Sequence, residues 1–373
     1  MSVVLCNVLN ATSMKNQFAH VRQLLTANGY DTKVTSTISV FDIKREELDG
    51  VIVMTLFDPY FLVSSAPALI QYNGKKIIYV TIEGVPKKSS VLYSPLTRLE
   101  YIAVSKFVAK MLTKAGCKVR ASVHHAINID DSIKALQIAP KVRAKLKSQF
   151  PNDVLFLFVG RNDPRKGIDK IIQANNILKQ EGLMNYRILV VSDPSIKNVL
   201  TDDRFVIVNP FGSMNHVQVL ALMRAVDYLI QPSLSEGFGL PVLEAMSVGT
   251  PTLHTWCPPF TEFSSDEFNF VWEYDTIQLV DTKMSQYFVM HEYDPLYLAD
   301  SIKDAIYCYV NDHETYEEYR IKALEHAVKW DYRLLYTELL SLEKFKIDKN
   351  KAKEDYSRSI EKLSEITDYT INV

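Results

Sequence analysis

The stretch that decides the fold is Gln231-Pro-Ser-Leu-Ser-Glu-Gly-Phe-Gly-Leu-Pro-Val-Leu-Glu-Ala-Met-Ser-Val-Gly-Thr-Pro251. It reads as the end of a strand, a glycine-rich loop, a helix and a turn toward another strand. Pro241 suits the first turn of a helix, and the glycines before it keep side chains out of the loop. The backbone amides of Phe238, Gly239 and Leu240 are therefore expected at a helix N-terminus, where they can donate hydrogen bonds to a ligand.

The alternation of strand and helix extends outward from this stretch in both directions. Asp153-Val-Leu-Phe-Leu-Phe-Val-Gly160 reads as a strand buried on both faces, and a helical pattern follows at Asp169–Gln180. Further strands are expected at 187–191, 205–208, 227–231 and 250–254. The earlier part of the chain repeats the pattern, with strands at 3–9, 51–56, 76–81, 101–104 and 120–124.

Two Rossmann-like, doubly wound α/β domains follow from this repetition, with a central cleft between the carboxyl ends of their strands. A chain of 373 residues also exceeds what one core usually supports. We expect a first domain at 1–150 and a second domain at 151–345, with the boundary near Pro140 to Pro151. Residues 346–373 are expected to form a helix that returns to the first domain, by analogy of fold.

Composition indicates an ordinary globular protein, because 47% of the residues are hydrophobic and 23% are charged. The first apolar run is too short for a signal peptide or a membrane span. The four cysteines are widely separated and form no CxxC pair, which argues against structural zinc and against a disulfide framework. These features favour a cytoplasmic protein.

Charge is divided unevenly along the chain. Residues 1–150 hold 20 Lys/Arg and 10 Asp/Glu, which leaves 22 and 34 for the remainder. Lys106, Lys110 and Lys114 are spaced to share one face of a helix, with Lys118 and Arg120 beyond its end. Most such stripes are solvated faces, but this one also suits peripheral contact with an anionic membrane or acceptor. No nucleic-acid-binding module accompanies it.

Two glutamates in the deciding stretch, Glu236 and Glu244, carry the functional interpretation. Taken alone, such carboxylates are usually solvated. The pattern Ser-x-Ser-Glu-Gly-Phe-Gly-Leu-Pro-x-Leu-Glu-Ala-Met-x-x-Gly-Thr-Pro, however, closely resembles the signature of family 4 glycosyltransferases, which are retaining enzymes of the GT-B fold. The resemblance implies that Glu236 contacts the transferred sugar, that Glu244 holds the ribose, and that the amides of residues 238–240 touch sugar hydroxyls. It also implies that 1–150 is the acceptor-side domain and that 151–345 is the nucleotide-sugar-binding domain.

A second segment, Gly160-Arg-Asn-Asp-Pro-Arg-Lys-Gly167, resembles the Gly-Arg-x4-Lys-Gly turn of the same family. A departing nucleotide diphosphate gains negative charge, which a guanidinium and an ammonium can offset without a metal. We therefore assign Arg161 and Lys166 to catalysis, with Gly160 beside the donor, and expect Arg165 to turn to solvent. No Asp-x-Asp stretch is placed to hold a metal, so no metal site is predicted.

Weaker similarities complete the site. Phe211 and Gly212 lie in the loop that borders the nucleobase in this family, although a plain turn is an equal alternative. On the acceptor or sugar side we place Glu83 and Ser13; the latter lies in a loop that lacks the glycines common in the family. His124 and His125 are interpreted as structural residues at a strand end.

The sequence thus predicts a retaining hexosyltransferase-type enzyme that uses a UDP- or GDP-sugar as donor and needs no cofactor. Its acceptor would be a hydroxyl of a glycan, lipid or small molecule. Two alternatives remain open. One is a phosphorylase or sucrose-synthase-like enzyme on the same fold, and the other is a sugar-nucleotide-binding protein without turnover.

Overall fold

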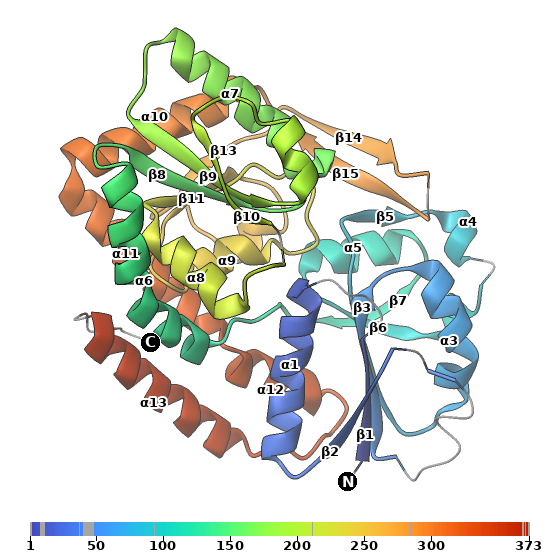
Figure 1. The fold of residues 1–373 in the computed structure, drawn as a ribbon. Coiled ribbons are helices and arrows are strands. Elements are labelled where there is room, and N and C mark those ends of the chain that lie inside the picture. Colours follow the sequence, from blue (N-terminus) through green and yellow to red (C-terminus); the bar gives the residue numbers. More distant parts are fainter. Residues whose placement is uncertain are drawn as a thin grey trace.

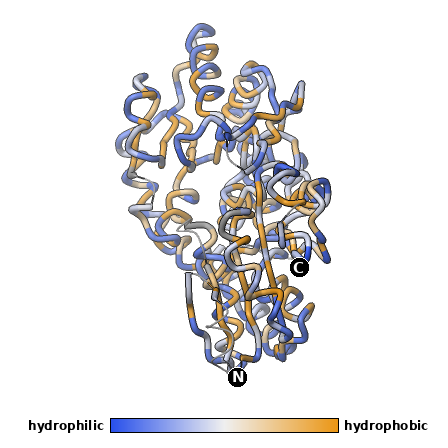
Figure 2. Tube along the Cα trace, turned by 90° about the vertical axis from the view of Figure 1, so that its right-hand side faces the viewer, coloured by the Kyte–Doolittle hydropathy of each residue, from blue (hydrophilic) through white to orange (hydrophobic). Residues whose placement is uncertain are grey.

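The computed structural model describes residues 2–7, 12–36, 38–39, 48–92, 94–210, 212–283 and 285–367, with Tyr369 and Ile371. For residues 7, 12, 13, 60, 61, 209 and 210 it describes the backbone alone. Two parallel six-stranded sheets, each packed between helices, form the two lobes of the molecule (Figure 1). Hydrophobic segments run through the interior of both lobes, as Figure 2 shows. The prediction of two Rossmann-like α/β domains is confirmed.

The sheet of the N-terminal lobe has the strand order β2-β1-β3-β4-β6-β7. Its strands are β1 (Ser2–Asn7), β2 (Asp31–Thr35), β3 (Gly50–Leu56), β4 (Lys75–Thr81), β6 (Glu100–Ala103) and β7 (Lys118–Ser122). Helices α1 (Thr12–Ala27), α3 (Pro59–Gln71) and α5 (Lys106–Lys114), together with the short α4 (Lys88–Val91) and η1 (Pro95–Arg98), complete this lobe. All of these strands except β2 were predicted from the sequence to within a few residues.

The sheet of the C-terminal lobe has the order β10-β9-β8-β11-β12-β13, which is the doubly wound order of dinucleotide-binding folds. Its strands are β8 (Val154–Val159), β9 (Tyr186–Ser192), β10 (Phe205–Pro210), β11 (Tyr228–Gln231), β12 (Thr252–Thr255) and β13 (Phe270–Trp272). Every residue of β8 is buried, because helices cover both faces of the sheet. These helices include α7 (Ile168–Gln180), α8 (His216–Ala225), α9 (Leu240–Met246) and α10 (Pro295–Asn311).

A third sheet, which the sequence analysis did not predict, joins the two lobes. It has the order β14-β15-β5, with β14 (Thr276–Asp281) and β15 (Gln286–Glu292) from the C-terminal lobe and β5 (Gly84–Pro86) from the N-terminal lobe. All pairings in it are antiparallel. In Figure 1 the hairpin of β14 and β15 reaches down from the upper lobe to meet β5.

Helix α6 (Ile129–Gln149) carries the chain from the first sheet to the second. It continues through Pro140 and packs along α8 of the C-terminal lobe. Arg143 donates from Nη2 to Oδ1 of the buried Asp227 at 2.7 Å and from Nη1 to the carbonyl of Ala225 at 3.0 Å. The helix is therefore fastened to the second lobe by charged hydrogen bonds as well as by apolar packing.

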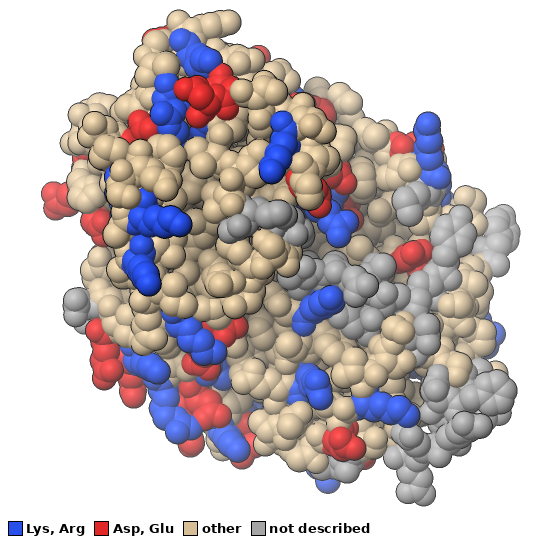
Figure 3. All heavy atoms as spheres, in the orientation of Figure 1, with Lys and Arg blue, Asp and Glu red and all other residues tan. Residues whose placement is uncertain are grey.

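The last helices lie across both lobes. After α11 (His313–Ala327), helix α12 (Tyr332–Ser341) packs against α1, and α13 (Lys349–Thr367) packs against α12 and α6. The backbone amides of Lys346 and Asp348 donate to the Tyr30 hydroxyl and to Oδ1 of Asn28, at 2.8 and 2.7 Å. Basic and acidic side chains are interspersed over this end of the molecule, at the lower left of Figure 3.

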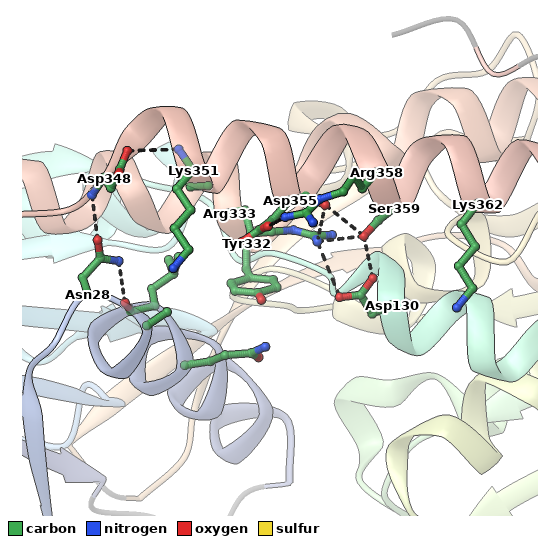
Figure 4. A pocket seen from close by; sticks show the side chains of 14 residues that line it. Asn28, Asp130, Tyr332, Arg333, Asp348, Lys351, Asp355, Arg358, Ser359 and Lys362 are labelled. Carbon is green, nitrogen blue, oxygen red and sulfur yellow. Dashed lines mark hydrogen bonds and ion pairs between the residues drawn. The ribbon is translucent and has the colours of Figure 1, made fainter.

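A groove of about 410 Å³ lies between α13 and the helices beneath it (Figure 4). Within it, the buried Arg333 pairs with both carboxylate oxygens of Asp331, at 2.7 and 2.9 Å. Its Nη1 donates to Oγ of Ser359 and to the carbonyl of Asp355, at 2.8 and 3.0 Å. None of the described residues predicted for the functional site lines this groove.

Among the described residues, no helix combines the length and the apolar character needed to cross a membrane. The four cysteines are buried and unpaired.

Candidate functional site

Glu236 is buried in the loop between β11 and α9. Gln231, the last residue of β11, donates from Nε2 to Oε1 of Glu236 at 3.1 Å. Pro241 lies in the first turn of α9, as predicted. Gly239 has a φ of 93°, and a Cβ there would lie 2.2 Å from Cε1 of Phe260. Glycine is therefore required for the loop to pass into the helix with Glu236 facing inward.

Lys166 meets Glu236 from η2 (Pro164–Lys166), the turn that follows β8. Its Nζ lies 2.5 Å from Oε1 of Glu236. The close approach depends on Gly167, which has a φ of 70° and whose Cβ would lie 2.1 Å from the carbonyl oxygen of Pro232. The structure thus joins the two motifs, which lie 70 residues apart in sequence, in one largely buried ion pair.

The pKa values of this pair reflect burial and attraction together. Burial alone would raise the pKa of Glu236, but Lys166 and Arg165 outweigh it and hold that pKa below its usual value. For Lys166 burial prevails over the attraction of Glu236, so its pKa is lowered. The carboxylate of Glu236 is accordingly ionised at neutral pH.

Arg165 does not turn to solvent, so that prediction is wrong. Its Nη2 lies 3.3 Å from Oε1 of Glu83, and its Nη1 lies 3.8 Å from Oε2 of Glu236. The guanidinium also lies over the ring of Phe288, 5.7 Å from its centroid, and near Asp163. A largely buried cation needs such partners, and Glu83, Glu236 and Phe288 come from segments far apart in sequence.

Arg161 lies outside this ion-pair cluster. Its side chain is exposed just after β8 and makes no hydrogen bond or ion pair with another residue of the described chain. Gly160 is buried before it, and the amide of Gly160 donates to the carbonyl of Val191 at 3.1 Å. Of the two cations assigned to catalysis, the structure brings only Lys166 to Glu236.

The carboxyl ends of the N-terminal strands touch the loop that carries Glu236. The Ser235 hydroxyl donates to the backbone carbonyl of Glu83, just beyond β4. The Ser105 hydroxyl, just beyond β6, donates to the carbonyl of Gly237 at 2.9 Å. A Cβ at Gly237 would lie 2.2 Å from Oγ1 of Thr81, so glycine allows the lobes to meet here. Glu83 therefore faces the cluster from the opposite lobe.

Glu244 lies on α9 and belongs to a separate contact. Its Oε1 is 3.4 Å from Nε2 of His216, the first residue of α8. The Nδ1 of His216 is 3.1 Å from Nδ2 of Asn16 on α1, so the contact also spans the two lobes. Burial raises the pKa of Glu244, and His216 opposes this in part.

Phe238, His124 and His125 are held by packing. The ring of Phe238 stacks on Phe263 at 4.6 Å between centroids and lies 5.3 Å from His125. Burial lowers the pKa of His125 to about 3. Nε2 of His124 lies 2.8 Å from Oε2 of Glu262, whose carboxylate also accepts from the first two amides of α5.

The remaining predicted residues are placed as follows. Leu240 is the buried first residue of α9. Gly212 is exposed, with a φ of 81° and open space where a Cβ would lie. Phe211 and the side chain of Ser13 fall outside the described residues.

Comparison with known proteins agrees with the motifs. The family model for glycosyl transferases group 1 matches residues 141–284. A protein of Sulfolobus islandicus rod-shaped virus 1, described as uncharacterized glycosyltransferase 335, is 31% identical over 336 residues, which cover 89% of this chain and 98% of the relative. The chain belongs to the glycosyltransferases. This enzyme also matches a D-inositol 3-phosphate glycosyltransferase of Mycobacterium sp. at 29% identity, over 35% of the chain and 30% of that protein.

Solved structures assign the glycosyltransferase to the GT-B fold. A glycosyltransferase from Rickettsia africae superposes with a TM-score of 0.69 at 16% identity, covering 92% of this chain and 97% of the other. Anabaena HepE, solved in complex with UDP and glucose, superposes with a TM-score of 0.65 at 14% identity, covering 92% and 99%. At these identities the likeness concerns the fold alone.

Two residues of the glycosyltransferase site were not predicted from the sequence. Arg165 belongs to the ion-pair cluster around Glu236, and His216 contacts Glu244. For His216 a partial signal exists, because Asn215 and Gln218 form a capping box that marks the start of α8. Its pairing with Glu244 depends on how α8 and α9 pack, which no local pattern shows. For Arg165 the deciding partners, Glu83 and Phe288, lie on the strands β5 and β15 or directly beside them.

Proposed function

We propose that this glycosyltransferase moves a sugar from a nucleotide-diphosphate donor to a hydroxyl acceptor, with retention of configuration and without a metal. The observation that carries the proposal is the contact of Lys166 with the buried Glu236, where the two motifs meet. In this proposal Lys166 and Arg161 stabilise the departing diphosphate, and Glu236 orients the sugar. Glu244 anchors the ribose.

The remaining donor contacts come from backbone groups. The amides of residues 238–240, at the start of α9, bind sugar hydroxyls. Gly160, Phe211 and Gly212 border the nucleotide, and Glu83 and Ser13 lie on the acceptor or sugar side.

The chemistry requires stabilisation of charge more than proton abstraction. As the bond between the anomeric carbon and the phosphate oxygen breaks, negative charge grows on the diphosphate, and a buried ammonium offsets it strongly. The acceptor oxygen forms the new bond to the same face of the sugar, and its proton passes to the departing phosphate. No side chain is assigned as general base. The ionised Glu236 supports the positive charge that develops near the anomeric carbon.

Release of nucleotide diphosphate from a panel of donors tests the proposal directly. We expect the purified enzyme to release UDP or GDP from one of UDP-glucose, UDP-galactose, UDP-N-acetylglucosamine and GDP-mannose, at the same rate with and without EDTA. Loss of turnover in EDTA would exclude the metal-free mechanism. Binding of donors without release, whatever acceptor is added, would contradict sugar transfer from them. Inversion of the anomeric centre in the product would contradict retention.

We also propose that the acceptor side contacts an anionic membrane surface through α5. Lys106, Lys110, Lys114 and Lys118 are exposed, whereas Arg120 is paired with Glu343. Each lysine near an anionic surface contributes about 1 kcal/mol. The enzyme should therefore sediment with vesicles containing phosphatidylserine and not with phosphatidylcholine alone. Changing the three α5 lysines to glutamine should weaken binding roughly a hundredfold; unchanged binding would rule this surface out.

A further inference from the structure

The sheet that joins the lobes is tightly fitted. Strand β15 pairs with all three residues of β5. Gly84 lies opposite Phe288, Val85 opposite Tyr287, and Pro86 opposite Gln286. A Cβ at Gly84 would lie 1.9 Å from the carbonyl oxygen of Tyr287, so a larger residue cannot be accommodated unless the strands separate. Beyond the ladder, Nζ of Lys87 lies 2.6 Å from Oδ1 of Asp281. At this sheet the contact between the lobes is thus a backbone ladder followed by an ion pair.

Arg165 connects this sheet to the candidate site. Glu83, which its Nη2 contacts at 3.3 Å, is the residue directly before β5. Phe288, over whose ring it lies, is the β15 residue that pairs with Gly84. Arg165 therefore contacts β15 and the residue directly before β5, at the end of the ladder where Gly84 pairs with Phe288.

The other side of the same guanidinium faces Glu236. Lys166 and Gln231 both contact Oε1 of that carboxylate, at 2.5 and 3.1 Å, whereas Arg165 lies nearest to Oε2. Nη1 of Arg165 also donates to the carbonyl of Ser235 at 3.3 Å, which holds the backbone just before Glu236. Each oxygen of the carboxylate thus has its own cation, and the cation at Oε2 is the one tied to the ladder.

We propose that Arg165 is a positioning residue, which holds Glu236 in its working orientation only while β5 is paired with β15. The interdomain sheet then controls sugar transfer, because separation of its strands withdraws Glu83 and Phe288 from Arg165 and frees Oε2 of Glu236. This inference rests on the role proposed above for Glu236 at the donor sugar.

Two measurements on full-length variants test the link. The first is steady-state release of nucleotide diphosphate, with the most active donor of the panel. The second is hydrogen exchange at the amides of β5 and β15 in the free protein, which needs no donor. The variants are Arg165→Gln, Arg165→Lys, Gly84→Val and the double variant Arg165→Gln/Gly84→Val. Arg358→Gln is the matched control, since Arg358 forms an exposed ion pair with Asp355 on α13.

Arg165→Gln and Gly84→Val should each lower kcat at least tenfold and speed exchange in β5 and β15 at least tenfold. The KM for the donor should change less than threefold, because ribose and phosphate contacts remain. The kcat of the double variant should be no more than about twofold below that of the less active single variant. Arg165→Lys should recover part of the loss, and Arg358→Gln should match the wild type in both measurements.

Three results would overturn the inference. One is a kcat within twofold of wild type in Arg165→Gln. A second is a lowered kcat with unchanged exchange in β5 and β15, which would make Arg165 a local residue with no link to the sheet. A third is a reduction of kcat in the double variant that equals the product of the reductions in the two single variants. If the wild type releases no nucleotide from any donor, the proposed function fails, and the exchange data alone decide the link: unchanged exchange in Arg165→Gln rejects it, and faster exchange upholds it.

Discussion

Replacement of Lys166 by alanine should lower turnover at least tenfold, a loss of roughly 1.4 kcal/mol or more of transition-state stabilisation. The ammonium is the cation that contacts Glu236 at 2.5 Å, and in the proposed mechanism it faces the charge that grows on the diphosphate. Glu236→Gln should cause a loss of similar size. Because the two groups act as a pair, the double variant should be little worse than either single variant.

The pH profile of the Lys166→Ala enzyme adds a second test. In the wild type the pKa of Glu236 lies below its usual value, so the carboxylate stays ionised as the pH falls until well into the acid range. Removing Lys166 takes away the largest opposition to burial and leaves only Arg165 and the hydrogen bond from Ser233 to lower the pKa of Glu236, so that pKa should rise. The acid limb of kcat/KM should therefore move to higher pH.

Lys179→Ala serves as the matched control for Lys166, because Lys179 pairs with Asp202 on the surface of the same lobe. It should leave the rate and the pH profile unchanged. Rates near wild type in Lys166→Ala, or an acid limb that stays in place, would remove Lys166 from the site.

Replacement of Arg333 by methionine should destabilise the protein by about 3–5 kcal/mol, because it leaves the fully buried Asp331 without its cation. Arg333 also fastens α12 to α13 through Ser359 and the carbonyl of Asp355, so the terminal helix should loosen. Unfolding in guanidinium chloride, monitored by circular dichroism, gives the free energy of unfolding of the variant and of the wild type.

Two variants separate the buried pair from general damage at this position. Arg333→Met/Asp331→Asn should recover part of the loss, since the neutral amide leaves no unpaired buried charge and its Oδ1 can still accept from the backbone amide of residue 333 at the start of α12. Arg358→Gln, on the exposed face of α13, should change stability by less than about 1 kcal/mol. A loss below about 1 kcal/mol in Arg333→Met would show that the network contributes little.

Local patterns predicted those parts of the fold that local chemistry determines. Buried strands such as β8 are continuous apolar runs, and Gly239 with Pro241 marked the loop and the helix that follows. No strand was predicted at β14, although Thr276 to Leu279 alternate polar and apolar residues; all six residues of the strand are exposed, so no buried face accompanies the alternation. β5 has three residues, and its pairing partner lies two hundred residues away.

The candidate site was predictable to the same extent. The motifs located Lys166 and Glu236, since their spacing within each loop is local. The environment of Arg165 could not be predicted from the sequence, because the carboxylates that contact it, Glu83 and Glu236, come from two lobes. Proline usually ends a helix, yet α6 continues nine residues beyond Pro140, so this residue does not mark the end of the element.

The attachment of α6 affects how the enzyme can be divided into pieces. Cutting the gene at residue 151 would leave Asp227 buried without Arg143 and would uncover the side of α8 that α6 shields. Such a fragment should aggregate, although it contains every strand of its sheet. A fragment that starts before Asn128, the N-cap of α6, would carry its own cover and is the better candidate for independent expression.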